Sequence, residues 1–361
     1  MKILFFIDNL GYGGKERRLL ELLKGLSNNS NFELHLVLVK NEVVYKEIYQ
    51  TKVNIHLAVR ENLKKDPRVF IKFYKIVKLI KPDLIHVWGN LEAIYALPAK
   101  LLLNIPMINS QIANAYDHFP KVLNHKLSFP FSDLIIANSN AGLKAYNAPL
   151  HKSKVIYNGF DFKRLEKMRD KNEILENLGI KTLFVAGMVA SFAARKDYTT
   201  FMKAINLVIE QNTDISFLCI GDGDFMPYQN LLDIGSTEHV IFLGHQQDVE
   251  SIMNICDLGI LTTFTEGISN SILEFMALGK PVIVAGGGGC VELVTDNVNG
   301  FILKSGDYIE LANRILFLMS NLNTLGSFGI ESKKIVENKF SMDKMTANFE
   351  CEYENLLSKS N

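Results

Sequence analysis

Two glutamates, Glu266 and Glu274, stand eight positions apart in a segment that reads FTEGISNSILEFMALGKP (264–281). A glycine and a run of polar residues follow Glu266, and a Gly-Lys-Pro sequence comes later, so the pattern predicts a loop that enters a short helix. Glu266 is expected on the loop and Glu274 about one turn into the helix. The backbone N–H groups near Asn270 and Ser271 would lie at the helix start, where the helix dipole favours an anion. This arrangement could hold a diphosphate between a sugar-binding and a ribose-binding carboxylate.

A plainer interpretation of the same residues stays open. Ser271-x-x-Glu274 also matches a capping box, in which a serine and a glutamate satisfy the first N–H groups of a helix. Glu266 could equally be an ordinary acid on the protein surface. These residue types alone do not decide between an anion site and a capped helix.

The elements that must position these residues follow from the hydrophobic pattern. Six short apolar runs in the first half are typical of strands: 2–7, 32–39, 53–57, 83–88, 106–110 and 133–139. Five more follow in the second half: 182–189, 216–221, 240–244, 258–263 and 281–285. Helical patterns lie between the runs, for example leucines at helical spacing over 16–26. Strands that alternate with helices predict parallel βαβ units, and hence an α/β fold with doubly wound sheets.

The same alternation predicts the domain organisation. The segment 163–179 is charged and helical with no strand, so we place the junction near Asp161. The predicted domains are residues 1–160, residues 161–339 and a terminal amphipathic helix, 340–361, that packs across the junction. Doubly wound sheets bind ligands beyond the carboxyl ends of their strands, so the site is expected in the cleft between the two halves.

The composition excludes several classes of protein. An apolar fraction of 48% and a charged fraction of 22% are ordinary for a folded soluble chain of 361 residues. Lysine plus arginine balances aspartate plus glutamate at 39 each, so we expect no nucleic-acid partner. The four cysteines form no CxxC pair, which fits a reducing cytoplasm. The first apolar run is too short for a signal peptide, and no run reaches the ~20 apolar residues of a membrane-spanning helix.

The Glu266–Glu274 segment resembles the E-x7-E signature of family-4 glycosyltransferases, and further motifs of that family follow the same order along the chain. They resemble its GG-x-E loop, its IxNGxD junction, its GG-x-x-E turn and its NGF element, at 13–16, 155–161, 286–292 and 299–301. The resemblance implies a GT-B fold, with two Rossmann-like domains facing a central cleft. It also implies that the amino-terminal domain takes the acceptor, that the carboxy-terminal domain takes the nucleotide-sugar donor, and that the enzyme retains the anomeric configuration.

The resemblance further implies roles for single residues. Glu274 would bind the ribose hydroxyls of the donor, and Glu266 would contact the hydroxyls of the transferred sugar. Gly13 and Gly14 would lie over the donor phosphates or the acceptor. The amides expected on the diphosphate are those of Ile268, Ser269, Asn270 and Ser271.

The family pairs these groups with an arginine and a lysine that stabilise the leaving diphosphate. Lys196 matches the lysine, but Ser191 stands at the arginine position, and a serine cannot supply a fixed cationic fork. Arg195 could swing in as a substitute, or the phosphates could rest on Lys196 and the helix alone. A solvated helix start is the alternative for Arg195 and Lys196. The expected catalytic residues are therefore Glu266, Lys196 and Arg195.

Two other motifs could be mistaken for cofactor or metal sites. The Gly11–Gly14 turn has Glu16 where a dinucleotide fingerprint needs its third glycine, so we expect no nicotinamide cofactor. Asp222-Gly223-Asp224 matches the DxD pattern of metal-dependent glycosyltransferases, but its position after a strand and before Pro227 favours a turn. The resemblance is to metal-independent enzymes, so we expect no metal and no cofactor.

Three features on the expected acceptor side are less specific. His86 and Trp88 end a predicted strand, and His86 could contact a sugar or be structural. The basic run 64–81 could dock on an anionic membrane that carries a lipid-linked acceptor, or be a solvated helix face. The segment 119–131 is a possible acceptor loop. Neither NSQIAN (109–114) nor His118 matches the histidine that the family often carries there, so we name no general base.

These patterns predict a retaining glycosyltransferase that moves a sugar from a UDP-sugar or GDP-mannose to a glycan or lipid-linked acceptor. Surface polysaccharide synthesis, in the cytoplasm or at the inner face of the membrane, is the expected setting. A non-catalytic nucleotide-sugar-binding protein on a degenerate GT-B fold is the alternative, because Ser191 departs from the family pattern. A sugar-nucleotide epimerase of similar architecture is disfavoured, because it would lack the E-x7-E helix.

Overall fold

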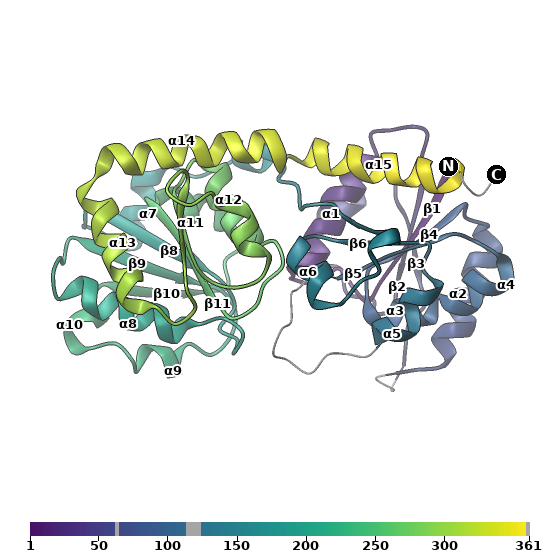
Figure 1. The fold of residues 1–361 in the computed structure, drawn as a ribbon, viewed down its shortest axis with the longest axis horizontal. Helices are drawn as coiled ribbons and strands as arrows, with labels where there is room; N and C mark the ends of the chain where they lie inside the picture. Colours follow the sequence, from purple (N-terminus) through teal and green to yellow (C-terminus); the bar gives the residue numbers. More distant parts are fainter. Residues whose placement is uncertain (62–64, 113–123, 359–361) are drawn as a thin grey trace. The chain divides into compact units, whose positions relative to one another are not determined.

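The computed structural model describes three stretches of the chain, residues 1–61, 65–112 and 124–358. It divides into two compact units: Met1–Gly159 with Met342–Asn361 form the amino-terminal unit, and Phe160–Ser341 form the carboxy-terminal unit (Figure 1). Four of the features singled out in the sequence lie wholly or partly outside the described residues: Lys64, the end of the NSQIAN segment, His118 and residues 119–123 of the 119–131 segment.

The amino-terminal unit is built on a parallel sheet whose described strands run in the order β3-β2-β1-β4-β5-β6-β7. They are β1 Lys2–Ile7, β2 Glu33–Leu38, β3 Asn54–Leu57, β4 Leu84–Val87, β5 Met107–Ile112, β6 Leu134–Ala137 and β7 Ser153–Val155. The helices are α1 Gly14–Leu26, α2 Arg68–Ile80, α3 Asn90–Tyr95, α4 Leu97–Leu103, α5 Asn124–Ser128, α6 Asn140–Ala145 and α15 Met342–Ser358. Short 3-10 turns are η1 Lys46–Gln50, η2 Phe129–Phe131 and η3 Leu150–Lys152. The pattern missed β7 because its three residues include a single apolar side chain.

Strand β1 shows why the predicted strands are continuous in apolar residues. Ile3, Phe5 and Ile7 pack into a core that includes residues of α1 and α15. Leu4 and Phe6 pack into a second core with residues of α2, α3 and α4. Successive side chains of a strand point to opposite faces, and helices cover both faces of this sheet, so no position of β1 after Lys2 meets water.

The carboxy-terminal unit repeats this plan with a parallel sheet in the order β10-β9-β8-β11-β12-β13. Its strands are β8 Phe184–Val189, β9 Ile215–Ile220, β10 Val240–Gly244, β11 Leu258–Thr263, β12 Val282–Gly286 and β13 Gly300–Leu303. Its helices are α7 Lys171–Asn177, α8 Tyr198–Ile209, α9 Met226–Gln229, α10 Ile234–Thr237, α11 Val249–Ile255, α12 Asn270–Ala277, α13 Tyr308–Ser320 and α14 Leu322–Lys339. The 3-10 turns are η4 Phe162–Leu165 and η5 Gly289–Leu293. Strand β13 was not predicted, because the sequence was read there only as the NGF motif.

The segment 163–179, predicted as helical, is interrupted. It contains the turn η4 and the helix α7, which begins after Asp170. The Asp170 side chain accepts hydrogen bonds from the N–H groups of Asn172 and Glu173, at 2.9 and 3.1 Å. An aspartate with this bonding is an N-cap, so it starts a new helix rather than continuing one.

Candidate functional site

Two loops of the carboxy-terminal unit are tied together at the carboxyl ends of β8 and β11, which are paired strands. The loop after β8 forms an antiparallel bridge between Lys196 and Thr263, the last residue of β11. The N–H of Phe264 donates to the carbonyl of Arg195 at 3.0 Å, and the N–H of Asp197 donates to Thr262 at 3.1 Å. Two segments about seventy positions apart in sequence are thereby held side by side.

These loops bring Lys196 and Glu266 into direct contact. The Lys196 Nζ donates to Glu266 Oε2, and the two side chains are only 7% and 14% exposed. The interpretation of Glu266 as an ordinary surface acid is therefore wrong. A lysine ammonium has three N–H donors, so one bond to Glu266 leaves further donors for an anion.

The glycine run after β12 is explained by its close approach to Glu266. Gly288 has a φ of 89°, and a Cβ there would lie 2.1 Å from the carbonyl oxygen of Glu266. The N–H of Gly289 donates to that same oxygen at 2.7 Å. Gly286, with a φ of 124°, approaches the carbonyl of Thr263 in the same way. Only glycine fits such positions, and the turn fixes the backbone that carries Glu266.

Cys290 follows this turn and is fully buried. Burial, together with the nearby Glu266, raises the pKa of its thiol to about 12. The thiol is therefore neutral near pH 7, and a neutral thiol is a poor nucleophile.

The start of α12 has a different cap from the one that the sequence suggested. Ser269 is the N-cap, and its hydroxyl accepts from the N–H of Ile272 at 3.4 Å. Ser269 and Ser271 are linked through their hydroxyls at 3.0 Å. The capping box at Ser271-x-x-Glu274 is therefore wrong, because Ser271 is already inside the helix. Ile268 and Ser269 are each 4% exposed, whereas Asn270 and Ser271 are partly exposed at the helix start.

Glu274 lies one turn into α12, as predicted, and is 8% exposed. Its Oε1 accepts from Nη2 of Arg164 at 2.8 Å, and the same guanidinium contacts Glu250 of α11. Sequence reasoning missed Arg164 and Glu250. Arg164 sits in the run FKRLEK, where nothing distinguishes it from a solvated cation, and Glu250 has the position of an ordinary first-turn acid.

Arg195 and Ser191 lie on the same loop after β8. Within the described part of the chain, Nε of Arg195 is buried and has no hydrogen-bond partner. The carbonyl of Ser191 accepts from the N–H of Ala193 at 2.8 Å, which makes a tight turn at the expected arginine position. The N–H of Phe192 donates to the carbonyl of Asp222 at 2.7 Å, so this loop also touches the DxD segment.

The DxD segment forms the predicted turn. Asp224 Oδ1 accepts from the N–H of Met226 at 3.0 Å, and Gly221 and Gly223 both have positive φ. Oδ2 of Asp222 lies 3.5 Å from Nδ1 of His245. Over residues 1–61, 65–112 and 124–358, no cluster of three or more His, Cys, Asp or Glu could hold a metal ion.

The remaining candidates belong to the amino-terminal unit. Gly13 is the N-cap of α1 in an extended conformation, and Gly14 is the first residue of that helix. The Glu16 carboxylate folds back over this helix start, 2.2 Å from where a Cβ at Gly13 would lie. A glycine here leaves room for that carboxylate at the helix start. The role of Gly13 and Gly14 toward the donor stays a prediction.

His86 is a structural residue. It has no exposed surface; its Nδ1 bonds the Tyr353 hydroxyl at 2.9 Å and its Nε2 bonds the Ser110 hydroxyl at 2.7 Å. Burial, and secondarily the nearby Arg18, lowers the pKa of His86 well below 6.5. Trp88 is also fully buried. A sugar cannot reach either ring.

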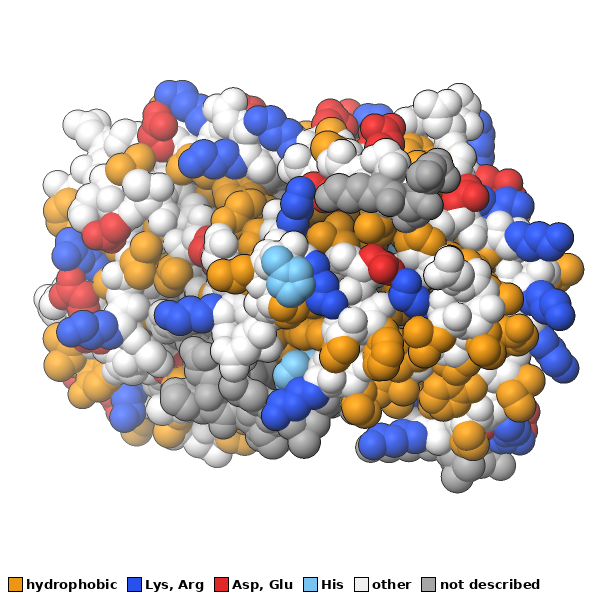
Figure 2. Space-filling view, turned by 45° about the vertical axis from the view of Figure 1, so that its right-hand side comes forward, with side chains coloured by type: hydrophobic (Ala, Val, Ile, Leu, Met, Phe, Trp, Pro, Cys, Tyr) orange, Lys and Arg blue, Asp and Glu red, His pale blue; other side chains and the backbone are white. Residues whose placement is uncertain are grey.

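Most of the basic run forms α2, in which the residues of the run have different surroundings. Phe73 is buried in the core, so the aromatic residues of the run face inward. Arg68 and Lys72 are paired, with Asp66 and Glu61 as their partners. The cations left on the exposed side are Lys75, Lys78 and Lys81, and the exposed apolar residues of α2 and α4 beside them are Ile71, Leu79, Leu101 and Leu102. Figure 2 shows cationic side chains along the edge of this unit, next to a broad hydrophobic area.

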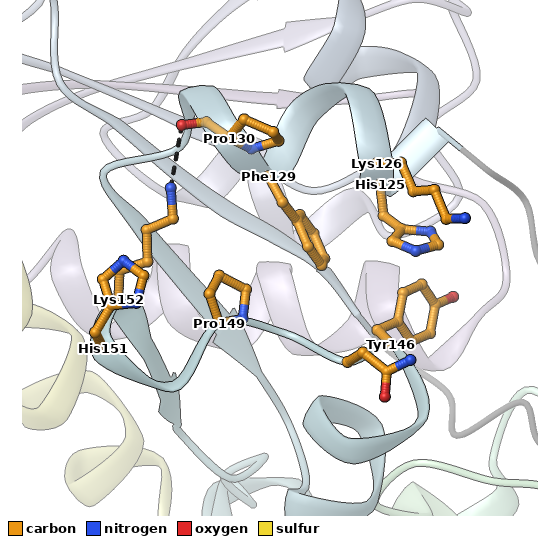
Figure 3. Close-up of a pocket in the computed structure, with 9 residues that line it drawn as sticks. His125, Lys126, Phe129, Pro130, Tyr146, Pro149, His151 and Lys152 are labelled. Carbon is orange, nitrogen blue, oxygen red and sulfur yellow. Dashed lines mark hydrogen bonds between the residues drawn. The ribbon is translucent and has the colours of Figure 1, made fainter.

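The described part of the 119–131 segment lines a pocket of about 460 Å³ in the amino-terminal unit (Figure 3). Its lining residues are His125, Lys126, Phe129, Pro130, Tyr146, Asn147, Pro149, His151 and Lys152. The ammonium of Lys152 already donates to the carbonyls of Pro130 and Ser132, at 3.1 and 2.9 Å. This lysine therefore ties η3 to η2 at one side of the pocket.

Comparison with known proteins identifies the class of this fold. Residues 12–164 match the family described as Glycosyltransferase Family 4, and residues 181–321 match Glycosyl transferases group 1. The crystal structure of Alr3699/HepE from Anabaena in complex with UDP-glucose aligns with 98% of this chain and 100% of its own chain, with a TM-score of 0.85 and 23% identity. The fold is GT-B, the two-domain architecture of nucleotide-sugar glycosyltransferases.

Two curated relatives align over most of their length. The UDP-Gal:alpha-D-GlcNAc-diphosphoundecaprenol alpha-1,3-galactosyltransferase of Escherichia coli is 26% identical over 275 residues, 71% of each chain. The N-acetylgalactosamine-N,N'-diacetylbacillosaminyl-diphospho-undecaprenol 4-alpha-N-acetylgalactosaminyltransferase of Campylobacter jejuni is 26% identical over 325 residues, 84% of this chain and 86% of that one. The chain belongs to the family-4 glycosyltransferases and is a transferase enzyme.

Proposed function

We propose that this glycosyltransferase moves a sugar from a UDP-sugar or GDP-mannose to a glycan or lipid-linked acceptor, with retention, in surface polysaccharide synthesis. The observation that carries the proposal is the buried Lys196–Glu266 pair beside the start of α12. It supports a site in which the Lys196 cation contacts the Glu266 carboxylate, a few positions before the N-terminus of α12. That combination suits a sugar diphosphate, which has hydroxyls at one end and negative oxygens at the other.

In this proposal the donor is held by charge. Departure of the nucleoside diphosphate builds negative charge on the β-phosphate, and Lys196, Arg195 and the amides of the α12 start stabilise that charge as it develops. Glu266 orients the hydroxyls of the transferred sugar. Because Ser191 replaces an arginine, more of the stabilisation would fall on Lys196 and on Arg195, whose buried Nε has no partner in the described chain.

The test uses a panel of radiolabelled sugar nucleotides, with release of the nucleoside diphosphate as the readout. Lys196→Ala and Glu266→Ala should both lose most of the turnover on the best donor. The matched control is Lys181→Ala, which removes an exposed lysine of the same unit and should match the parent. If Lys196→Ala and Glu266→Ala also match the parent, the site assignment is wrong.

The acceptor side of the proposal is a glycan or a lipid-linked saccharide. The names of the two relatives above refer to diphosphoundecaprenol-linked sugars, which supports a lipid-linked acceptor. None of the helices in the described part of the chain is long and apolar enough to cross a membrane. The exposed lysines of α2 support a further part of the proposal, peripheral contact with the inner face of the membrane, in the cytoplasm, through the 64–81 region. Lys75, Lys78 and Lys81 would face anionic lipids there.

Vesicle sedimentation tests this contact. Lys75→Ala/Lys78→Ala should weaken binding to vesicles of phosphatidylglycerol and phosphatidylcholine by about 30-fold, because each cation near an anionic surface contributes about 1 kcal/mol. Lys333→Ala/Lys339→Ala removes the same charge from exposed positions of α14 and should bind like the parent. Equal weakening by both double variants would indicate a general charge effect and would contradict docking through α2.

A further inference from the structure

Arg164 is the centre of a buried ion cluster formed by three separate segments of the carboxy-terminal unit. It belongs to η4, while Glu250 belongs to α11 and Glu274 to α12. Its Nε donates to Glu250 Oε1 at 2.7 Å, and its Nη2 donates to Glu274 Oε1 at 2.8 Å. The three side chains are between 10% and 12% exposed. One guanidinium thus serves two carboxylates that are largely shielded from water.

The plane of this guanidinium is fixed by packing. Its Cζ lies 4.9 Å from the centroid of the Phe160 ring, and Phe160 is itself 2% exposed. The N–H of Phe160 donates to the carbonyl of Phe340 at 2.8 Å, which anchors the backbone just before η4. Because a guanidinium presents its donors in a rigid planar fork, fixing Arg164 fixes the direction from which Glu274 is held.

We propose that Arg164 is a positioning residue that orients the Glu274 carboxylate to accept the ribose hydroxyls of the donor. The inference rests on the proposed function and on the ribose-binding role that the family resemblance implies for Glu274. Arg164 acts through Glu274 and does not itself touch the nucleotide. Its charge is needed as well as its shape, because Glu250 and Glu274 are two shielded carboxylates that would lose the cation they share. Like charges in that position favour protonation or displacement of one of them.

The proposal predicts a loss of ribose recognition rather than a uniform loss of binding. A hydrogen bond from a ribose hydroxyl to a charged carboxylate corresponds to about 10- to 100-fold in affinity. The parent enzyme should therefore bind UDP about 10- to 100-fold more tightly than 2′-deoxy-UDP or 3′-deoxy-UDP. In Arg164→Ala this preference should shrink to a few-fold, with a higher KM for the donor and a smaller change in kcat.

The experiment measures the affinities of UDP and its two deoxy forms, and of GDP and 2′-deoxy-GDP, by calorimetry for the parent and the variants. The matched control is Arg169→Ala. Arg169 pairs with Asp248 at 2.8 Å at the start of the same helix α11, but its side chain is 44% exposed. Arg169→Ala should keep the full preference for the ribose hydroxyls.

Two further variants keep the test decisive if Arg164→Ala folds poorly. Arg164→Lys retains the positive charge without the planar fork and should show an intermediate preference. Arg164→Gln/Glu250→Gln removes the charge of both partners, so no like-charge pair remains. If the guanidinium orients Glu274, this double variant should still lose the preference for UDP over its deoxy forms.

The outcomes separate the two levels of inference. If the parent prefers the ribonucleotides and the Arg164 variants keep that preference at full size, Arg164 is only structural and the proposal is overturned. If the parent binds a nucleoside diphosphate equally well with and without its ribose hydroxyls, Glu274 does not bind the ribose. The proposal for Arg164 is then overturned, but the proposed class of donor is not. If neither UDP nor GDP binds the parent, the proposed donor class falls and the role of Arg164 falls with it.

Discussion

Both units bury charged side chains, and Arg18 of one unit and the Lys196–Glu266 pair of the other lie in different surroundings. In the amino-terminal unit, Arg18 is 4% exposed, donates to the carbonyl of Ile156 at 2.6 Å and lies against the rings of Trp88 and Phe349. These groups sit between the sheet and α15, inside the core. In the carboxy-terminal unit the Lys196–Glu266 pair sits instead on two loops at the ends of β8 and β11.

This comparison shows that burial of a charged residue does not by itself indicate a functional site. Arg18 and His86 are enclosed by aromatic rings, and they hold the last helix of the chain to the sheet. Lys196 and Glu266 lie at the edge where parallel sheets bind ligands. Four changes test this contrast, from the largest expected effect to the smallest.

Phe349→Ala should cause the largest loss of stability. Phe349 is fully buried against Trp88, with ring centroids 6.0 Å apart, so its removal leaves a cavity in the core. A Phe→Ala change of this kind costs about 3–5 kcal/mol. The chain has one tryptophan, so Trp88 fluorescence reports denaturant unfolding of this unit specifically. The exposed control Glu354→Ala should unfold with the parent, and a similar loss in both variants would contradict a local core effect.

Lys196→Ala should reverse that pattern, with a large loss of rate and little change in the Trp88 transition. Removing one donor that stabilises a developing oxyanion usually lowers the rate by about 10²–10³. Single-turnover release of the nucleoside diphosphate measures the rate. A shift of the Trp88 transition as large as that of Phe349→Ala would show that Lys196 acts on the fold, and the contrast between the units would then be lost.

Arg195→Ala should lower the rate by about 10- to 100-fold, the usual size of a lost charged hydrogen bond. If Arg195 takes the place of the arginine that Ser191 replaces, Ser191→Arg should restore much of the rate in the Arg195→Ala background. In the parent background the same Ser191→Arg change should have little effect. Arg195→Ala alone could instead keep the normal rate, with no gain from adding Ser191→Arg. In that case Lys196 and the helix start would provide the charge stabilisation without Arg195.

His86→Gln should remove part of the acid sensitivity of the amino-terminal unit. Burial lowers the pKa of His86 in the folded protein well below its unfolded value of 6.5. Below pH 6.5 the unfolded chain therefore binds a proton that the folded chain does not, so stability falls as the pH falls, by up to about 1.4 kcal/mol per pH unit. Denaturant unfolding at pH 7.5 and 5.5 should show a steeper loss for the parent than for the variant. Equal slopes would mean that the pKa of His86 is the same in the folded and the unfolded chain, and would contradict the lowered pKa.

Much of the fold could be predicted because the signal is repeated many times along the chain. Eleven apolar runs alternate with helical patterns, and most of the strands that they predict are buried on both faces; the edge strands β3 and β10 are partly exposed. The two missed strands, β7 and β13, have weak or ambiguous patterns of their own. They form because an existing sheet offers an edge with unpaired backbone groups, which a short segment can satisfy.

The candidate site also has features that local sequence predicts and features that depend on tertiary contacts. The sequence by itself determined the loop and helix that carry Glu266 and Glu274, because glycine, polar cap residues and periodic apolar residues act locally. Only the tertiary structure decided which partners they have. Lys196 reaches Glu266, and Arg164 reaches Glu274 from 110 positions away, through the pairing of parallel strands and the packing of helices. Contacts of this kind leave no local sequence pattern. The residue type and its neighbours in the sequence do not show whether an arginine is paired and shielded or solvated.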